Sequence, residues 1–339
     1  MAGLYIHIPF CKQRCNYCAF YSSTLYNMRE EYVAALTKEL LLRKDYAHGK
    51  AIETIYFGGG TPSTLGIEQL QRICSTIYSA YPVTNSPEVT IECNPDDLTP
   101  EFLEALRPLP FNRISMGVQS FNDAQLQRLG RRHTAEGART AVGNARKAGY
   151  TNISIDLMFA LPGSTPQQWQ EDLDSAIALR PQHLSAYNLM YEEGTPLYSA
   201  LCNGGITELS EEENLEQFRM LIESMKKAGY RHYEISNFAL PGYEAKHNSA
   251  YWRHIPYSGF GPGAHSFSRG RERHPLHWLW SSRTLLQRHR ARVEHCRYKR
   301  VYKRDRERQP QIRNRAPERR RALQRHNTHP PAHSRRAAA

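Results

Sequence analysis

Three cysteines near the start of the chain have a spacing that restricts their chemistry. Cys11, Cys15 and Cys18 form a C-x3-C-x2-C run. A structural zinc site takes four tetrahedral ligands, and this run offers three thiolates with no fourth candidate nearby. Soft thiolates suit an iron–sulfur cluster, and three of them leave one iron open to another ligand. The run therefore predicts an iron–sulfur site, against the alternative of three unrelated free thiols.

The segment before these cysteines predicts where they lie in the fold. An apolar run over residues 4–8 has the character of a buried strand, and Pro9 closes it. The cysteines would then lie on a loop that leaves a strand end, which is where α/β proteins build active sites.

Similar apolar runs recur along the chain and alternate with amphipathic stretches. Strands are expected over residues 4–8, 54–57, 89–93, 113–118, 153–158 and 183–189. The helical stretches that alternate with them include residues 31–42, 67–81, 135–148, 169–179 and 211–227. Gly149 and Gly229 stand where helix C-caps belong. Six strand–helix units predict an α/β fold with a parallel sheet curled into an open (β/α)6 barrel.

A glycine-rich turn directly follows the second expected strand. Gly58, Gly59 and Gly60 precede Thr61 and Pro62. Consecutive glycines let the backbone approach a ligand closely and expose N–H groups to it. The alternative is a tight connection between a strand and a helix with no ligand.

Three polar side chains end or interrupt apolar strands in successive units. Glu92, Gln119 and Asp156 each lie near the end of an expected strand. Burying a carboxylate without a partner is costly, so each is expected to face the barrel mouth or to pair with a cation. Arg113 and Arg131 are the candidates for structural ion pairs, which are the alternative to a ligand site.

The residues around the cysteines resemble a known family. Residues 5–11, Tyr-Ile-His-Ile-Pro-Phe-Cys, with a tyrosine just before Cys18, are similar to the opening of the radical S-adenosylmethionine (SAM) enzymes. More narrowly, residues 4 to about 268 resemble the oxygen-independent coproporphyrinogen oxidase-like family. In that superfamily three cysteines hold a [4Fe-4S] cluster, SAM chelates the fourth iron, and reductive cleavage yields a 5′-deoxyadenosyl radical.

The resemblance also implies the residues of a SAM site. It assigns the amino-acid end of SAM to Gly59, Gly60 and Thr61. The positions implied for the ribose, adenine and methionine parts are Tyr5, Glu92, Gln119, Arg131 and Asp156, and Tyr17 is a further cofactor-binding candidate.

A later motif points to heme. Residues 247–252 read His-Asn-Ser-Ala-Tyr-Trp. Imidazole is a common axial ligand of heme iron, and Tyr and Trp rings stack on a flat macrocycle. The string is similar to an H-N-x-x-Y-W motif of the family's heme-chaperone branch, which implies heme contact through His247, against the alternative of a satisfied structural histidine. A turn-rich loop is expected over residues 259–266, where His265 is a second candidate.

Two features favour the heme-chaperone branch over the oxidases. The oxidases continue the cysteine run with a further cysteine, where this chain has Ala19-Phe20. They also carry an extension before the first strand. In this chain the first strand is expected to start at Leu4, which leaves no room for such an extension. The sequence therefore predicts a heme chaperone for respiratory hemoproteins, with recipients at a membrane surface and a homodimer among the expectations. The alternative is an oxygen-independent coproporphyrinogen III oxidase.

The positive charge of the chain is concentrated in its last part. Of the formal net charge of +12, residues 269–339 contribute +17 and the rest −5. This basic, low-complexity stretch cannot bury enough apolar surface to fold, so a disordered tail is expected. The alternatives for it are a nucleic-acid or acidic-lipid arm and a shifted reading frame, and the second is favoured. A third hypothesis for the function of the protein, an Arg-rich nucleic-acid binder, is supported only by this tail.

Composition also bounds organisation and location. The expected parts are a barrel over residues 1–235, a post-barrel segment over 236–268 and the tail. No apolar run of about 18 residues predicts a membrane span. No secretory signal is expected at the N-terminus, and the four cysteines outside the C-x3-C-x2-C run are scattered, which suits a reducing cytoplasm.

Overall fold

One mixed sheet organises the protein in this computed structural model, which describes residues 2–47 and 49–268. Within those ranges the sheet has nine strands in the order β7-β8-β6-β5-β4-β3-β2-β1-β9. The strands are β1 (Ala2–Ile8), β2 (Ile52–Gly59), β3 (Val83–Cys93), β4 (Arg113–Gln119), β5 (Ile153–Phe159), β6 (His183–Asn188), β7 (Arg231–His232), β8 (Asn237–Ala239) and β9 (Tyr257–Phe260). The predicted tail, residues 269–339, lies outside the described residues.

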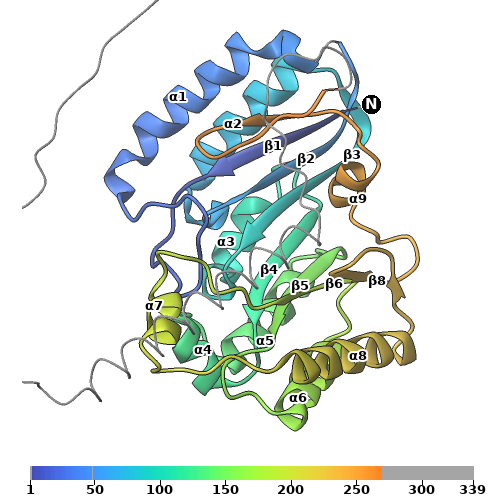
Figure 1. Cartoon of the computed structure of the whole chain (residues 1–339). Helices are drawn as coiled ribbons and strands as arrows, with labels where there is room; N and C mark the ends of the chain where they lie inside the picture. Colours follow the sequence, from blue (N-terminus) through green and yellow to red (C-terminus); the bar gives the residue numbers. More distant parts are fainter. Residues whose placement is uncertain (1, 48, 269–339) are drawn as a thin grey trace, which may run out of the picture. The chain divides into compact units, whose positions relative to one another are not determined.

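The six predicted strands form the parallel centre of this sheet. Strands β1 to β6 lie side by side in chain order, and each pairs in parallel with the next (Figure 1). Strand β9 adds a parallel partner to β1, whereas β8 pairs with β6 in the antiparallel sense. In the described part of the chain, β1 therefore pairs with β9 and β6 pairs with β8. Strands β1 and β6 do not pair with each other, so the barrel stays open. The predicted open parallel (β/α)6 arrangement is confirmed.

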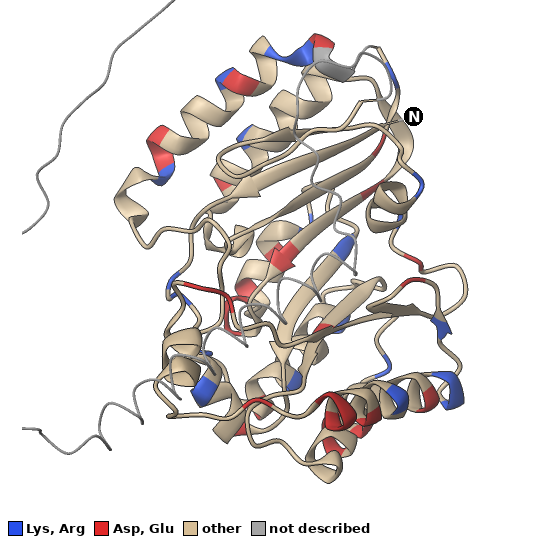
Figure 2. Cartoon of the chain, in the orientation of Figure 1, with Lys and Arg blue, Asp and Glu red and all other residues tan. Residues whose placement is uncertain are grey.

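Helices connect the strands, and capping side chains and glycines mark where several of them begin and end. They are α1 (Arg29–Leu42), α2 (Ile67–Ala80), α3 (Pro100–Leu106), α4 (Asp123–Leu129), α5 (Ala135–Lys147), α6 (Pro166–Ala178), α7 (Pro196–Cys202), α8 (Glu211–Lys227) and α9 (Lys246–Trp252). Helix α8 begins with a capping box between Ser210 and Glu213 and has acidic residues in its first turn and lysines in its last (Figure 2). Gly149 and Gly229 have φ of +87°, which confirms both predicted helix ends.

The two faces of the sheet differ in polarity. Leu4, Ile6 and Ile8 are fully buried in the same core cluster as apolar residues of α1 and α2. The alternate residues point to the opposite face, where Tyr5 and His7 lie. We call this opposite face the inner face and define it by Tyr5, Tyr56, Glu92, Ser115 and Asp156. A parallel strand buried against helices on both sides would be apolar throughout, so the polar alternation marks the inner face as a site.

The region after α8 differs from the sequence expectation. Residues 257–260 form β9 on the edge of β1, so the expectation of a loop over 259–266 is wrong for its first two residues. Glycine at position 259 lets the segment after β9 fold back against this strand, because a Cβ atom there would lie 2.2 Å from the carbonyl oxygen of His265. Within the described ranges no helix is both long and apolar enough to span a membrane.

Candidate functional site

The cysteine loop leaves β1 and is folded back on itself. The backbone N–H of Cys11 donates to the carbonyl of Ser23 (3.0 Å), and the N–H of Ser23 donates to the carbonyl of Pro9 (2.6 Å). Cys11, Cys15 and Cys18 are all partly exposed on this loop. The loop therefore presents three thiols at the C-terminal end of the first strand, as the sequence predicts.

The far part of this loop is anchored by helices distant in sequence. The N–H of Asn16 donates to the carbonyl of Leu129 at the end of α4, and its side-chain Nδ2 donates to the carbonyl of Arg128. The N–H of Leu197 in α7 donates to the carbonyl of Asn16. Gly130 has φ of +72°, and a Cβ atom there would lie 3.1 Å from the Asn16 side chain. Glycine at this position therefore lets the loop approach α4.

Two donors from other loops point at the cysteine sulfurs. Thr61 Oγ1 lies 3.5 Å from Cys11 Sγ, and Arg131 Nη1 lies 3.2 Å from Cys15 Sγ. Arg131 Nη2 also donates to Asn94 Oδ1 and to the carbonyl of Gly117, both at 2.6 Å. Hydrogen bonds to sulfur are what thiolate ligands of an iron–sulfur cluster receive, so the donor set fits such a group.

The thiols are not arranged around a single metal ion. In the described part of the chain, no three His, Cys, Asp or Glu side chains converge on one point as a single ion requires. A cluster places each thiolate on a different iron, so this spread is compatible with a cluster. Burial raises the pKa of Cys11 and of Cys18, so both are neutral thiols without a metal.

The glycine motif holds the end of β2 against the cysteine loop. The N–H of Gly60 donates to the carbonyl of Ile8, and the N–H of Thr61 donates to the carbonyl of Phe10, both at 2.7 Å. Gly59 has φ of +108°, and a Cβ atom on Gly60 would lie 2.8 Å from both carbonyl oxygens. The close approach seen here is to the chain itself, and the approach to a ligand stays a prediction.

Replacing Gly60 by Ala is expected to lower the free energy of unfolding by about 2 kcal/mol, because Ile8 and Phe10 must move away. Urea unfolding of the apo-protein measures the change. Gly143→Ala in α5 is the matched control, since a Cβ atom there meets nothing within 4 Å. That variant should gain about 1 kcal/mol, and a Gly60→Ala protein as stable as wild type would contradict the tight fit.

Two carboxylates lie on the inner face without the structural ion pairs that are the alternative to a ligand site. Tyr56 OH donates to Glu92 Oε1 (2.7 Å), and the N–H of Gly59 donates to Glu92 Oε2 (3.2 Å). Ser115 Oγ lies 3.4 Å from both oxygens of Asp156. Among the described residues, no Arg or Lys side chain lies within 4.0 Å of either carboxylate. The structural ion pair with Arg113 or Arg131 is therefore absent.

Glu92 makes the stability of the protein depend on pH. Burial raises its pKa to about 7, and the negative charge of Asp156 acts in the same direction. The folded protein thus keeps a proton that the unfolded chain releases above about pH 4.5, so stability falls as the pH rises from about 4.5 to 7. Urea unfolding at pH 5 and pH 8 should show a loss of about 2 kcal/mol that Glu92→Gln removes. Equal pH slopes in the two proteins would contradict this assignment.

The remaining SAM-site candidates lie at the end of β4, within β1 and on the cysteine loop. Gln119 ends β4 in a left-handed conformation, with φ of +71°, where the pairing with β5 is irregular. A non-glycine residue in that conformation is strained, and such strain concentrates at functional sites. Tyr5 stacks on Tyr56 on the inner face, and Tyr17 packs against the apolar cluster that contains Leu129.

His247 lies at the other end of the inner face, near the start of β2. Its ring nitrogens are 2.7 Å from Thr54 Oγ1 and 2.8 Å from Tyr251 OH, and its ring stacks on Tyr56. Glu88 accepts the backbone N–H of His247 (2.9 Å) and so fixes the start of α9. Burial lowers the pKa of His247 to about 3, so the ring is neutral.

Both ring nitrogens of His247 are therefore occupied, and ligation of heme iron requires at least one of these contacts to break. Tyr251 and Trp252 of the same motif are exposed, at 37% and 48%. His265 is also exposed, on the segment after β9. Heme contact at each of them stays a prediction.

The sequence did not reveal the carboxylates that hold these segments in place. Glu88 caps α9 from a strand 158 residues earlier, and Asp97 connects three loops near the cysteines. Asp97 follows Glu92 by five residues, in the 3-10 helix η4 (Pro95–Asp97). Its place just after a strand end was the only available signal.

A parallel sheet with a three-cysteine loop and a glycine motif after its first two strands is the arrangement of a radical SAM protein, and residues 5–176 match the family model of the radical SAM superfamily. A protein of Bacillus subtilis named "Heme chaperone HemW" is 38% identical over 272 residues, which are 80% of this chain and 72% of that protein. The Escherichia coli protein of the same name is 37% identical over 78% of this chain and 69% of its own length.

A solved structure is similar as well. It is titled "Coproporphyrinogen III oxidase (HemN) from Escherichia coli is a Radical SAM enzyme" and superposes with a TM-score of 0.68 at 26% identity. The match covers 78% of this chain and 64% of that chain. The chain belongs to the radical SAM superfamily and, within it, to the HemW-like family, which confirms the predicted family.

Proposed function

We propose that this protein is a heme chaperone that binds a [4Fe-4S] cluster, SAM and heme, and that it delivers heme to respiratory hemoproteins. The observation that carries this proposal is the 38% identity to a named heme chaperone over 80% of the chain. The cysteine run supports it, because Ala19-Phe20 stands where the resembling oxidases continue with a cysteine.

The cluster would be held by Cys11, Cys15 and Cys18, and when bound it supplies an electron and an open iron for SAM. The contribution of this chain is to fix the sulfurs. Thr61 and Arg131 direct hydrogen bonds at two of them from separate loops. Such donors orient thiolates and offset their negative charge.

SAM would lie along the ends of β2 to β5, on the inner face. The backbone at Gly59 to Thr61 would face its amino-acid end, and Glu92, Gln119 and Asp156 would face its nucleoside and methionine parts. Two carboxylates that form no ion pair with a described Arg or Lys suit a ligand that is itself a cation and that carries hydroxyl and amino donors. Tyr5, Tyr17 and Arg131 complete the proposed set.

Heme would bind near α9, with His247 as the candidate axial ligand and the exposed rings of Tyr251 and Trp252 as stacking surfaces. A cytoplasmic location is part of the proposal, because cysteines spread in this way suit a reducing compartment. Recipients at a membrane surface and a homodimer stay predictions.

The second candidate is oxidative decarboxylation of coproporphyrinogen III. The structural match to HemN, with a TM-score of 0.68 over 78% of this chain, favours it. Under that alternative the same cluster and SAM residues would serve a reaction instead of heme transfer.

Anaerobic reconstitution followed by two separate assays distinguishes the candidates. A chaperone should give a Soret band on addition of heme and no turnover of coproporphyrinogen III with SAM and reductant. A chain ending at residue 268 is the necessary control, because the seven histidines of residues 269–339 can bind heme adventitiously. Heme binding that disappears with those residues would overturn the chaperone proposal, and sustained turnover would establish the oxidase.

A further inference from the structure

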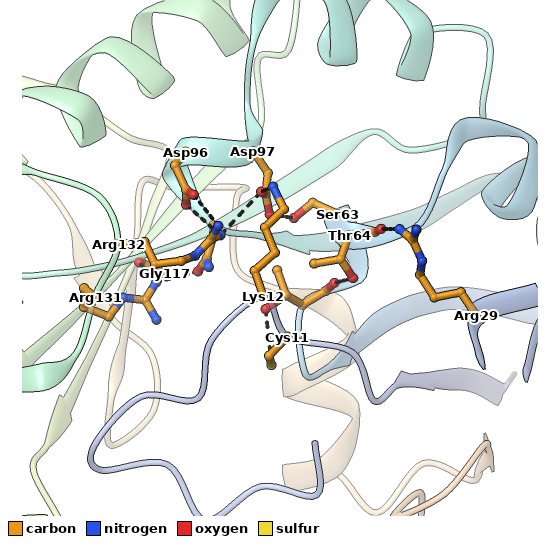
Figure 3. A network of polar contacts seen from close by, with 12 residues as sticks. Cys11, Lys12, Arg29, Ser63, Thr64, Asp96, Asp97, Gly117, Arg131 and Arg132 are labelled. Carbon is orange, nitrogen blue, oxygen red and sulfur yellow. Dashed lines mark hydrogen bonds and ion pairs between the residues drawn. The ribbon is translucent and has the colours of Figure 1, made fainter. Parts of the chain in front are cut away.

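One buried carboxylate connects three loops around the cysteines. Asp97, whose side chain is 2% exposed, receives Lys12 Nζ at 2.5 Å and Ser63 Oγ at 2.7 Å. Arg132 Nη2 lies 3.5 Å from the same oxygen that contacts Lys12. Figure 3 shows these side chains meeting at Asp97 from separate segments of the chain.

Each of the three partners lies within two residues of a cysteine or of a donor to a cysteine sulfur. Lys12 directly follows Cys11 in the chain. Ser63 belongs to the 3-10 helix η3 (Pro62–Thr64), which begins just after Thr61, the donor to Cys11 Sγ. Arg132 directly follows Arg131, the donor to Cys15 Sγ. Asp97 is therefore the common partner of the cysteine loop, the glycine motif and the segment after α4.

Because Asp97 is buried, its contacts are expected to contribute more to the stability of this region than exposed ion pairs would. Exposed ion pairs contribute little to stability, whereas a buried carboxylate that loses its partners is strongly destabilising. The neighbouring Asp96 offers a direct comparison. Its side chain is 27% exposed and forms an ion pair with Arg132, at 2.8 Å, and it makes no hydrogen bond or ion pair to the described residues of the cysteine loop or the glycine motif.

We propose that Asp97 is a positioning residue that holds the cysteine loop, the glycine motif and the Arg131 segment together before any cofactor binds. The inference rests on the proposed function in one respect, namely that Cys11, Cys15 and Cys18 hold the cluster. The carboxylate touches none of the sulfurs. It acts through Lys12, Ser63 and Arg132, which fix the positions of the two sulfur donors and of the cysteine-loop backbone.

Hydrogen exchange of the apo-protein, followed by mass spectrometry, tests this role without any cofactor. In Asp97→Asn, peptides covering residues 10–18 and 59–65 should exchange about tenfold faster than in wild type, because charge-assisted hydrogen bonds at both segments are weakened. Asp96→Asn is the matched control and should leave both peptides unchanged. Helix α8 packs against β5 and β7, away from β1 and β2, and therefore serves as the internal reference for global unfolding.

Reconstitution adds a second readout. The Asp97→Asn protein should lose iron to a chelator faster than wild type, whereas Asp96→Asn should not. If wild type takes up no cluster, the proposed function fails, but the exchange of the apo-protein still decides the role of Asp97. Unchanged exchange in Asp97→Asn, or an equal increase in Asp96→Asn, would overturn the inference.

Two further variants cover the case in which Asp97→Asn unfolds, seen as rapid exchange of α8. Lys12→Met removes only the donor from the cysteine loop, and Ser63→Ala removes only the donor from the glycine motif. Each should accelerate exchange mainly in its own segment, because the other arm stays bound to Asp97. Wild-type exchange in both variants would overturn the inference.

Discussion

Anaerobically reconstituted protein is expected to hold about four irons per chain, and replacement of Cys11, Cys15 and Cys18 by Ala is expected to bring that number close to zero. Each thiolate binds a different iron, so single replacements should also prevent a complete cluster. Iron analysis and the visible absorption of the reconstituted protein measure the loss. In wild type, SAM should change the electron paramagnetic resonance spectrum of the reduced cluster through its open iron.

Cys74 and Cys93 provide the control for this experiment. Both are buried in the core, at 5% and 3% exposure, and lie in α2 and β3. Replacing either by Ala should leave the iron content intact while lowering the free energy of unfolding by about 1 kcal/mol. A full cluster retained in the triple variant would refute the assignment of the three ligands. Iron lost equally in the Cys74 or Cys93 variant would mean that folding, and not ligation, is being measured.

The parts of the fold that the sequence predicts are those with strong local patterns. The six central strands contain β-branched and apolar residues in short runs, and α8 carries its capping box and charge bias within one segment. Strands β7, β8 and β9 have two to four residues each. Such short strands form only because an existing sheet edge supplies their hydrogen bonds, which no local pattern encodes.

Helix α9 shows the same limit. Its seven residues are largely polar, and its start is fixed by Glu88, far away in sequence. The candidate site divides in a similar way. Side chains at strand ends could be identified, because parallel strands bring their carboxyl ends to one edge of the sheet. Their partners could not, since Glu92 turns to Tyr56 and Gly59 instead of to an arginine. Contacts between distant loops, such as those of Asp97, depend on the completed fold.

Heme binding is expected to be lost in His247→Ala. That result alone does not identify the axial ligand, because the substitution also disturbs the structure around the residue. Removing the ring leaves Thr54 Oγ1 and Tyr251 OH without this partner and opens a cavity beside Tyr56. The free energy of unfolding should fall by about 3 kcal/mol, as measured in urea. A missing Soret band would then follow from either lost ligation or lost structure.

Tyr251→Phe separates these two causes. The substitution keeps the ring, which packs edge-on against Tyr257, and removes only the hydroxyl that contacts His247 Nε2. If His247 is the axial ligand through this nitrogen, heme no longer competes with that hydrogen bond, and its affinity should rise about fivefold. Titration of the Soret band measures the affinity.

Tyr257→Phe is the matched control, because it removes a hydroxyl from the neighbouring ring that does not contact His247. Its heme affinity should equal that of wild type. If heme binds to Tyr251→Phe and wild type with the same affinity and the same spectrum, then Nε2 of His247 is not the ligand. Ligation by His247 would then have to use Nδ1, which now lies 2.7 Å from Thr54 Oγ1, and the other candidate axial ligand is His265 on the exposed segment after β9.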